Sequence, residues 1–353
     1  MFLGTINLVI IFGIIVFGLW PFNFWPKNQV DWLEGQNGVH FYGRGIIFGE
    51  APTPSSLHPF SLEICLQPEK ESYDYTARIL SLHDGRRTEK VVLSQWKSGL
   101  IIQKRIQHRP EESYPKVGIR NALPKGEKRF LTLTSGPDGT KVYIDGKLAG
   151  KYPGFHLSAD NDSSFGRIVL GNSPRGTQPW HGNLYSLAVY GHSLTEEQVF
   201  RHYQGSVKKE GPPVEKGGLF ALYLFDEHSG ARANDGAGRN PLLIPSGFEV
   251  LQKTILVPPW EDFRWTLSYM KDVMTNILGF VPFGFFLSAY LRARTPSAIY
   301  RLLLISLLFT GFLGVSIELI QAHLPTRSSQ LMDVIMNMLG AALGTVLFHK
   351  IVK

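Results

Sequence analysis

Four long stretches of this 353-residue chain contain no charged side chain, and they restrict its possible folds more than any other feature. They cover residues 2–20, 273–291, 302–317 and 334–348. A helix needs about 20 apolar residues to cross the hydrocarbon core of a bilayer, within a range of roughly 17 to 25. The first two stretches are long enough, and the last two become so when their polar neighbours lie at the boundary. We therefore predict four transmembrane helices.

The average composition hides these helices, because 44% hydrophobic and 18% charged residues describe an ordinary soluble protein. The region between the first and second helices is polar and rich in Gly, Pro and Asp. The net charge of +7 fits cytoplasmic anchors at an anionic membrane surface, and the sequence contains no nucleic-acid-binding motif. We therefore predict the lipid bilayer as a partner and no binding of nucleic acid.

The first stretch has two interpretations, a retained membrane anchor or a cleaved signal peptide. No basic residue precedes it, and it lacks a cleavage site formed by two small residues. It is followed by Trp20-Pro-Phe-Asn-Phe-Trp-Pro26, and aromatic side chains of this kind are typical of the membrane interface. We favour the anchor.

The short loops predict the orientation of the helices. The loop after the second helix and the C-terminal tail are basic and contain Arg292, Arg294, Arg301, Lys350 and Lys353. The loop between the third and fourth helices contains only Arg327 and His323. Positively charged loops lie on the cytoplasmic side. We therefore expect residues 27 to about 260 on the extracytoplasmic side.

The extracytoplasmic region is predicted to be an all-β sandwich. Residues 130–134 and 141–144 read as strands that are separated by Pro137-Asp-Gly139 and followed by Asp145-Gly-Lys147, and Asp-Gly supplies the positive φ of tight turns. With more than 200 residues the region can form a two-sheet core without disulfides. The only cysteine, Cys65, lies in an alternating segment, and we expect it to be a packed core thiol.

Several segments of this region resemble the laminin G-like, concanavalin A-like jelly-roll family. The matching segments are residues 140–147, 167–172, 179–190 and 193–197, within a resemblance that covers most of 38–205. Residues 222–230 resemble the segment that opens such a domain, although here they come last. Residues 38–43 resemble its second strand, although here they come first. The order implies a circularly permuted sandwich.

This resemblance implies binding of sugar or protein rather than catalysis, although one fold hosts many functions. The candidate glycan-binding residues form a possible stacking platform: Asn172, Trp180, His181 and Tyr190. The same residue types are also common in turns and cores, and the sequence leaves both interpretations open. Asp226, Glu227 and Asp235 lack EF-hand-like spacing. We predict no metal and no cofactor.

An internal repeat marks a possible site among the membrane helices. Asp272-Val-Met-Thr-Asn-Ile-Leu-Gly279 returns as Asp333-Val-Ile-Met-Asn-Met-Leu-Gly340, with five identities in eight positions. Asp and Asn four residues apart lie on one face of a helix. With the polar residues near the third helix end, they form a predicted cluster at the extracytoplasmic boundary: Asp272, Asn276, Glu318, Gln321, Arg327, Asp333 and Asn337.

Residues 262–353 and the first helix resemble the VanZ-like family. The resemblance rests on the repeat, on Gly279-Phe-Val-Pro-Phe-Gly284, on Ser316-Ile-Glu-Leu-Ile-Gln321 and on Pro325-Thr-Arg327. Some members of this family are associated with resistance to glycopeptide antibiotics of the teicoplanin type. The predicted domains are the first helix and its aromatic exit over 1–26, the sandwich over 27–255, and a VanZ-like membrane domain with three helices over 256–353.

The cluster has three interpretations. It can be a packing network, a headgroup site for a lipid-linked glycan, or a catalytic site in which Glu318 or an Asp acts as base. No His-Ser, Cys-His or metal constellation supports an enzyme. We predict a multi-pass protein of the bacterial cytoplasmic membrane whose sandwich binds envelope polysaccharide. The alternatives are an outer-leaflet enzyme or carrier for lipid-linked saccharide, and a scaffold for a partner protein.

Overall fold

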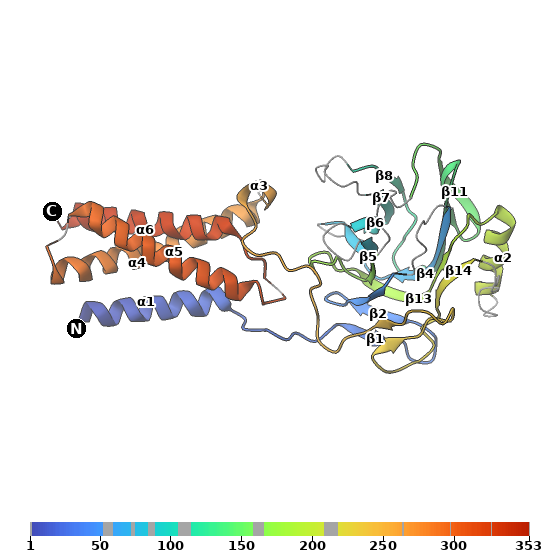
Figure 1. Cartoon of the computed structure of the whole chain (residues 1–353), viewed down its shortest axis with the longest axis horizontal. Coiled ribbons are helices and arrows are strands. Elements are labelled where there is room, and N and C mark those ends of the chain that lie inside the picture. Colours follow the sequence, from blue (N-terminus) through green and yellow to red (C-terminus); the bar gives the residue numbers. More distant parts are fainter. Residues whose placement is uncertain are drawn as a thin grey trace. The chain divides into compact units, whose positions relative to one another are not determined.

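The computed structural model describes residues 2–51, 59–71, 75–83, 89–104, 114–157, 166–207, 218–262, 265–296, 298–325 and 327–352. The chain forms two compact units. One unit combines residues 1–26 with 253–353, and the other contains residues 27–252 (Figure 1). We describe each unit by itself.

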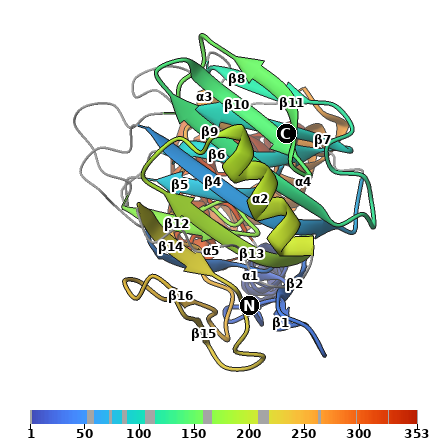
Figure 2. The ribbon, with the colours of Figure 1, turned by 90° about the vertical axis from the view of Figure 1, so that its right-hand side faces the viewer.

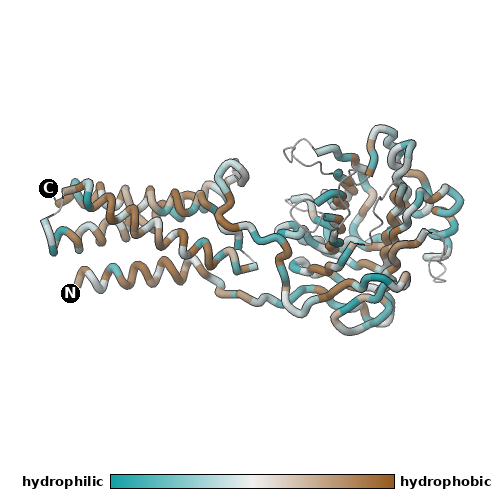
Figure 3. Tube along the Cα trace, in the orientation of Figure 1, coloured by the Kyte–Doolittle hydropathy of each residue, from teal (hydrophilic) through white to brown (hydrophobic). Residues whose placement is uncertain are grey.

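The first unit is helical. Its long helices are α1 (Phe2–Leu19), α4 (Leu267–Arg294), α5 (Ile299–Gln321) and α6 (Leu331–Ile351), preceded by the short α3 (Pro259–Asp262). All four long helices have the length and apolar composition needed to cross a membrane, which confirms the four predicted spans. Hydrophobic residues dominate these helices in the hydropathy view (Figure 3). Their apolar outer surfaces are what a lipid environment requires.

Helices α4 and α6 pack so closely that three glycines are required between them. A Cβ atom on Gly340 would lie 2.1 Å from the Ile277 carbonyl oxygen, and one on Gly344 would lie 2.0 Å from that of Val281. A Cβ on Gly284 would lie 2.0 Å from the Ala341 carbonyl oxygen. From the Gly340–Ile277 pair to the Gly344–Val281 pair the contact advances in the same direction along both helices, so α4 and α6 are parallel. Small residues allow this approach.

The second unit is a sandwich of two antiparallel sheets. Sheet I has the order β1 (Val30–Trp32), β2 (Val39–Tyr42), β13 (His181–Tyr190), β4 (Phe60–Pro68), β9 (Arg129–Gly136), β10 (Gly139–Ile144), β11 (Lys147–Tyr152), with β14 (Leu219–Tyr223) also on β13. Sheet II has the order β15 (Arg232–Ala233), β16 (Leu242–Leu243), β3 (Ile47–Glu50), β12 (Arg167–Leu170), β5 (Ala77–His83), β6 (Glu89–Trp96), β7 (Gly99–Lys104), β8 (Lys116–Ile119). The all-β jelly-roll prediction is confirmed.

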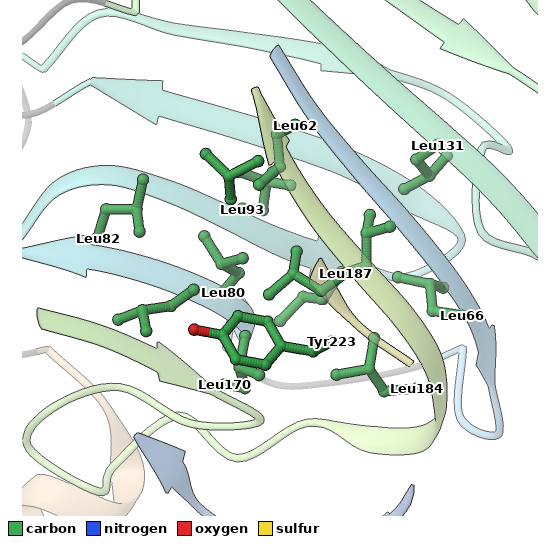
Figure 4. Packing of buried hydrophobic residues seen from close by; sticks show 14 of the residues in the cluster. Leu62, Leu66, Leu80, Leu82, Leu93, Leu131, Leu170, Leu184, Leu187 and Tyr223 are labelled. Atoms are coloured by element: carbon green, nitrogen blue, oxygen red, sulfur yellow. The ribbon is translucent and has the colours of Figure 1, made fainter. Parts of the chain in front are cut away.

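The core lies between the two sheets. Leu62 and Leu66 of β4 point inward toward Leu80, Leu82 and Leu93 of sheet II, and all five are buried (Figure 4). Alternate residues of β4 face the other way, because successive side chains of a strand point to opposite faces. Cys65 is one of these and is also buried, and burial raises the pKa of its thiol. It is a packed thiol, as predicted.

The two predicted hairpin turns are present. Gly139 joins β9 to β10 with a φ of +94°, and Asp145 and Gly146 join β10 to β11 with φ values of +52° and +74°. Positive φ at both central residues matches the right-handed twist of the flanking strands. These turns fix the register of three consecutive strands.

Strand β14 belongs to the same sheet as β2. Residues 181–184 of β13 pair with β2, residues 187–190 pair with β14, and β4 lies along the other edge of β13. The Gly38 amide donates to the Phe225 carbonyl at 2.8 Å and joins the two segments. The late segment is therefore part of the sandwich, as predicted, while the circular permutation stays a prediction from the resemblance.

Helix α2 (Glu196–Val207) lies on the outer face of sheet I (Figure 2). Its buried residue Val199 packs with Tyr143, Tyr190 and Leu222, and its Tyr203 ring approaches Phe130 with a centroid distance of 6.2 Å. An amphipathic helix covers a sheet face in this way when the face carries apolar side chains.

Candidate functional site

Glu318 of the predicted membrane cluster caps another helix. Its side chain is 2% exposed, and Oε2 accepts a hydrogen bond of 2.7 Å from the Gln330 backbone amide. Gln330 is the N-cap residue of α6, and its own side chain makes no capping bond. A carboxylate near a helix N-terminus stabilises the unpaired amides and the positive end of the dipole. Glu318 of α5 therefore anchors the start of α6.

Gln321 and Arg327 bond to the end of α1. Gln321 Nε2 donates to the Gly18 carbonyl at 2.6 Å, and an Arg327 guanidinium nitrogen donates to the Trp20 carbonyl at 2.8 Å. The last carbonyls of a helix have no partner within it, and a cation there is favourable. These two side chains therefore fasten α1 to the connection between α5 and α6.

The remaining cluster residues come from the two copies of the repeat, and their burial differs between the copies. Asp333 in the first turn of α6 is half-buried and close enough to Glu318 for an electrostatic interaction. Asn337 is 5% exposed, and its side-chain oxygen has no hydrogen-bond partner in the described part of the chain. In the other copy, Asp272 is exposed and Asn276 is half-buried. The structure brings five of the seven residues to the α5–α6 connection and leaves the α4 copy at the periphery.

Three of the four candidate glycan-binding residues are interior. Asn172 is buried, and its Oδ1 accepts from the Ser173 and Gln178 amides, so it forms a turn. Trp180 is 1% exposed, and its Nε1 donates to Gln95 Oε1 at 2.7 Å.

Tyr190 is also 1% exposed, because it lies beneath α2. These three therefore act as turn and core residues and cannot form a stacking platform in this structure. His181 alone stays half-buried at the surface.

The part of sheet I beneath α2 contains a buried hydrogen-bonded network around Glu63. His202 Nδ1 of α2 lies 3.0 Å from Glu63 Oε2, the Tyr190 hydroxyl donates to the same oxygen at 3.1 Å, and Thr132 donates to Oε1 at 3.3 Å. The side chains of His202 and Glu63 are 0% and 2% exposed. Several donors on one carboxylate compensate its removal from water. The network holds α2 on the sheet.

The open part of the same face contains a row of polar side chains across four strands. Asp31 of β1 pairs with His40 of β2, His40 pairs with Asn183 of β13, and Asn183 pairs with Gln67 of β4. His40 Nδ1 lies 2.5 Å from Asn183 Oδ1, and the Tyr185 hydroxyl donates to Gln67 Oε1 at 2.5 Å. Sequence reasoning missed this row. The alternation in Val39-His-Phe-Tyr42 was the available signal, because Val39 and Phe41 are buried core residues and the other two face outward.

A hollow of about 480 Å³ lies over this row. Residues of β1, β2 and β13 and of the neighbouring turns line it: Asp31, Trp32, Leu33, Glu34, His40, Tyr42, Glu69 and Asn183. Ligand pockets commonly measure about 300 to 1,000 Å³ and place a few polar groups among aromatic ones. His181 lies beside the hollow as the cross-strand partner of Tyr42. Burial, followed by the nearby Lys70 and His40, lowers the pKa of its imidazole.

Two family models match the chain. The model described as VanZ/LLP1 matches residues 218–353, and the model described as concanavalin A-like lectin/glucanases superfamily matches residues 49–200. The first match begins just before β14 and therefore includes three strands of the sandwich. Comparison with curated proteins found no match.

Several solved structures are similar to the chain at low identity. A putative carbohydrate binding protein from Bacteroides ovatus is 16% identical with a TM-score of 0.45, and the alignment covers 62% of this chain and 58% of that protein. A sialidase CBM40 from Ruminococcus gnavus, bound to α2,3 sialyllactose, is 14% identical with a TM-score of 0.38, covering 47% and 95%. A SAP-like pentraxin from Limulus polyphemus is 15% identical with a TM-score of 0.37, covering 62% and 93%.

The two family matches agree with the two kinds of structure in the chain. Helices long enough to cross a membrane lie within residues 218–353, and most strands of the sandwich lie within 49–200. The chain therefore combines a VanZ/LLP1 domain with a laminin G-like domain of the concanavalin A-like superfamily in one membrane protein.

Proposed function

We propose that this protein is a multi-pass protein of the bacterial cytoplasmic membrane that holds its sandwich on the extracytoplasmic side to bind a glycan of the cell envelope. One observation carries the proposal: in the sequence, a concanavalin A-like sandwich is inserted between α1 and the long helices that match the VanZ/LLP1 model. The chain enters residues 27–252 from α1 and leaves them toward α3 and α4, so the sandwich is tied to the membrane at both ends. Such a tether keeps a weak binding domain at a high local concentration near the membrane surface.

The charge of the loops supports this orientation. Arg292 and Arg294 lie in the last turn of α4 and Arg301 in the first turn of α5, at the end of the helical unit opposite to the α5–α6 connection. Arg327 is the only Lys or Arg in the latter connection, and its guanidinium bonds to the end of α1. The basic loop is the one expected in the cytoplasm. The chain then enters and leaves the sandwich on the extracytoplasmic side of the bilayer.

A binding measurement on the full chain tests this proposal. The protein in lipid nanodiscs is incubated with soluble fragments of envelope polysaccharide, with empty nanodiscs as the control. We expect saturable retention of a fragment by the protein-loaded discs only. Absence of retention, together with capture of a single envelope protein by the same discs, would reject glycan binding and favour the scaffold.

The membrane cluster supports a second candidate function, binding the headgroup of a lipid-linked glycan. The observation in its favour is the buried Asn337 oxygen without a partner in the described residues, since such an oxygen accepts a hydroxyl donor at little cost. Asp333 lies one turn nearer to the helix end on the same face. Two carboxylates, Glu318 and Asp333, near one arginine disfavour a bare phosphate and favour a hydroxyl-rich sugar.

A double variant separates this second function from packing. Glu318→Gln with Asp333→Asn keeps the volume and hydrogen-bonding capacity of both side chains and removes their charge. If the cluster binds a headgroup, the variant accumulates normally in the membrane and loses any change in glycopeptide susceptibility that expression of the wild-type protein causes. An unchanged effect at normal abundance would reject the headgroup site.

A further inference from the structure

The outer face of sheet I has two parts with opposite chemistry. Beneath α2 the outward side chains are buried, and they include Cys65, Phe130 and Tyr190. Over β1 and β2 the outward side chains are polar or aromatic, and no element in the described part of the chain covers Tyr42, which is 54% exposed. In Figure 2 α2 crosses β4, β9 and β13 and leaves β1 and β2 uncovered. Helix α2 therefore covers one side of this face, and the side over β1 and β2 remains available for binding.

The open part is held in a fixed arrangement before any ligand arrives. Asn183 Nδ2 donates to Gln67 Oε1 and lies 3.4 Å from the Tyr185 hydroxyl, while Gln67 Nε2 donates to the Gly126 carbonyl at 2.6 Å. The Lys128 ammonium lies 4.0 Å from the centroid of the Tyr185 ring. Side chains that are already ordered lose little conformational entropy on binding, so the row is preorganised.

Tyr42 supplies apolar surface in the hollow, together with Trp32 and Leu33. Its ring lies beside the His40 ring with a centroid distance of 3.9 Å and an interplanar angle of 60°. A ring supported on one side and open on the other presents a flat face at low entropic cost. The C–H face of a pyranose ring is the complementary surface, and its hydroxyl edge then meets the row of polar side chains.

The charge of the lining restricts the ligand. The lining contains the carboxylates of Asp31, Glu34 and Glu69 and no lysine or arginine. Lys27 lies 3.7 Å from Asp31 and His40 Nδ1 lies 3.4 Å from Glu69, but Asp31 and Glu69 are both about half exposed, at 51% and 48%. Ionised carboxylates accept hydrogen bonds from hydroxyl groups and repel other anions.

We propose that the hollow over β1, β2 and β13 is the glycan-binding site of the sandwich, and that it takes an uncharged pyranose ring and excludes acidic sugars. The ring stacks on Tyr42, and its hydroxyl groups donate to Glu69 and Glu34 and bond to Asn183. This inference rests on the proposed glycan-binding function and deepens it. It assigns binding to four residues outside the four candidates taken from the sequence.

The test compares point variants of the full chain in lipid nanodiscs. Binding is measured to an array of uncharged oligosaccharides of glucose, galactose, mannose and N-acetylglucosamine, with sialyllactose as the acidic probe. Tyr42→Ala and Asn183→Ala should each weaken binding of the preferred uncharged glycan about tenfold, the value of one stacked or hydrogen-bonded contact. Trp96→Ala removes another exposed aromatic side chain, on β6 of sheet II, and should leave binding unchanged. Unfolding midpoints of all variants show whether the sandwich is intact.

A charge-reversal variant keeps the test informative if either alanine variant unfolds. Glu34→Lys changes an exposed residue and should raise binding of sialyllactose at least severalfold. Wild-type protein that binds an uncharged glycan, with unchanged affinity in Tyr42→Ala and Asn183→Ala, would overturn this site and leave the proposed function intact. Wild-type protein that binds no glycan would overturn both. Stronger binding of sialyllactose than of every uncharged probe would overturn the assigned ligand class.

Discussion

The helical unit and the sandwich both hold polar side chains in clusters, but they satisfy them in different ways. In the helical unit, Glu318, Gln321 and Arg327 bond to backbone groups of other segments. On the open part of sheet I, His40 and Asn183 bond to other side chains of the same sheet. The hydrogen bonds in the helical unit join separate segments of the chain, whereas those on sheet I order side chains at a surface. Polar groups of the same residue types therefore have different roles, which depend on the groups that they bond to and on how far they are exposed.

The same contrast exists between two His–Glu pairs on one sheet face. His202 and Glu63 are fully covered by the contact between α2 and the sheet, whereas His40 and Glu69 meet at the open side, where Glu69 is 48% exposed. Both pairs join a ring nitrogen to a carboxylate. Their surroundings assign one to stability and the other to the binding surface.

Loss of the buried His202–Glu63 pair should lower the free energy of unfolding more than any other change predicted below. Glu63→Ala removes the buried carboxylate that His202, Tyr190 and Thr132 share, and loss of one partner of such a pair costs about 3 to 5 kcal/mol. Urea unfolding of the full chain in detergent, followed by tryptophan fluorescence, measures the loss. The matched variant Glu69→Ala should cost less than about 1 kcal/mol, because the Glu69 carboxylate is about half exposed to solvent. Equal losses in the two variants would contradict the division of the face.

The two copies of the internal repeat give the second test. Gly340→Ala places a methyl group against the backbone of α4 and should destabilise the helical unit by about 3 kcal/mol. The equivalent Gly279 has open space where a Cβ would lie, so Gly279→Ala should be neutral or gain up to about 1 kcal/mol from helix propensity. Thermal unfolding in detergent and abundance in the membrane report both changes. Similar behaviour of the two variants would show that the copies are equivalent.

Removal of the Glu318 cap should have a smaller effect. Glu318→Ala removes the carboxylate that accepts a hydrogen bond from the Gln330 amide at the start of α6, and this loss should cost about 1 to 3 kcal/mol. Glu318→Gln retains an oxygen acceptor at the same place and should retain most of the stability. The difference between the two midpoints of thermal unfolding measures the cap. An alanine variant with the unfolding midpoint of wild type would show that Glu318 does not contribute to helix packing.

The smallest effect concerns the pH dependence of the sandwich. Burial, together with Lys70 and His40, lowers the pKa of His181 below its ordinary value of 6.5 in the folded state. The unfolded chain therefore binds more protons than the folded chain as the pH falls through 6.5, and the free energy of unfolding decreases there. His181→Gln should show a smaller loss of stability between pH 7.5 and pH 5.5 than wild type.

Much of the fold was predictable because it follows from local requirements. The four apolar stretches must be helices in a bilayer, since a backbone in lipid has to satisfy its own hydrogen bonds. Asp145-Gly146 predicts a hairpin because few other pairs adopt two positive φ values in succession. Neither prediction needs knowledge of distant contacts.

The site was less predictable because it depends on contacts between distant segments. Tyr190 lies on the outer face of β13, but α2 covers it, and the sequence did not reveal the position of α2. His40 and Asn183 are 143 residues apart and meet only after β2 and β13 pair. For the same reason, the repeat did not reveal that only one of its two copies packs between other helices. Its α6 copy packs between α4 and α5, whereas Gly279 of the α4 copy faces open space.

The side of the membrane on which the sandwich lies decides whether it can meet an envelope glycan at all. Cys65 is buried, so single cysteines introduced elsewhere can be labelled in intact cells with an impermeant thiol reagent at low background. Ser328, Ala298 and Lys147 are exposed positions in the α5–α6 connection, the α4–α5 loop and the sandwich. We predict labelling of Ser328→Cys and Lys147→Cys in intact cells, and of Ala298→Cys only after permeabilisation. Labelling of Ala298→Cys alone in intact cells would contradict the account.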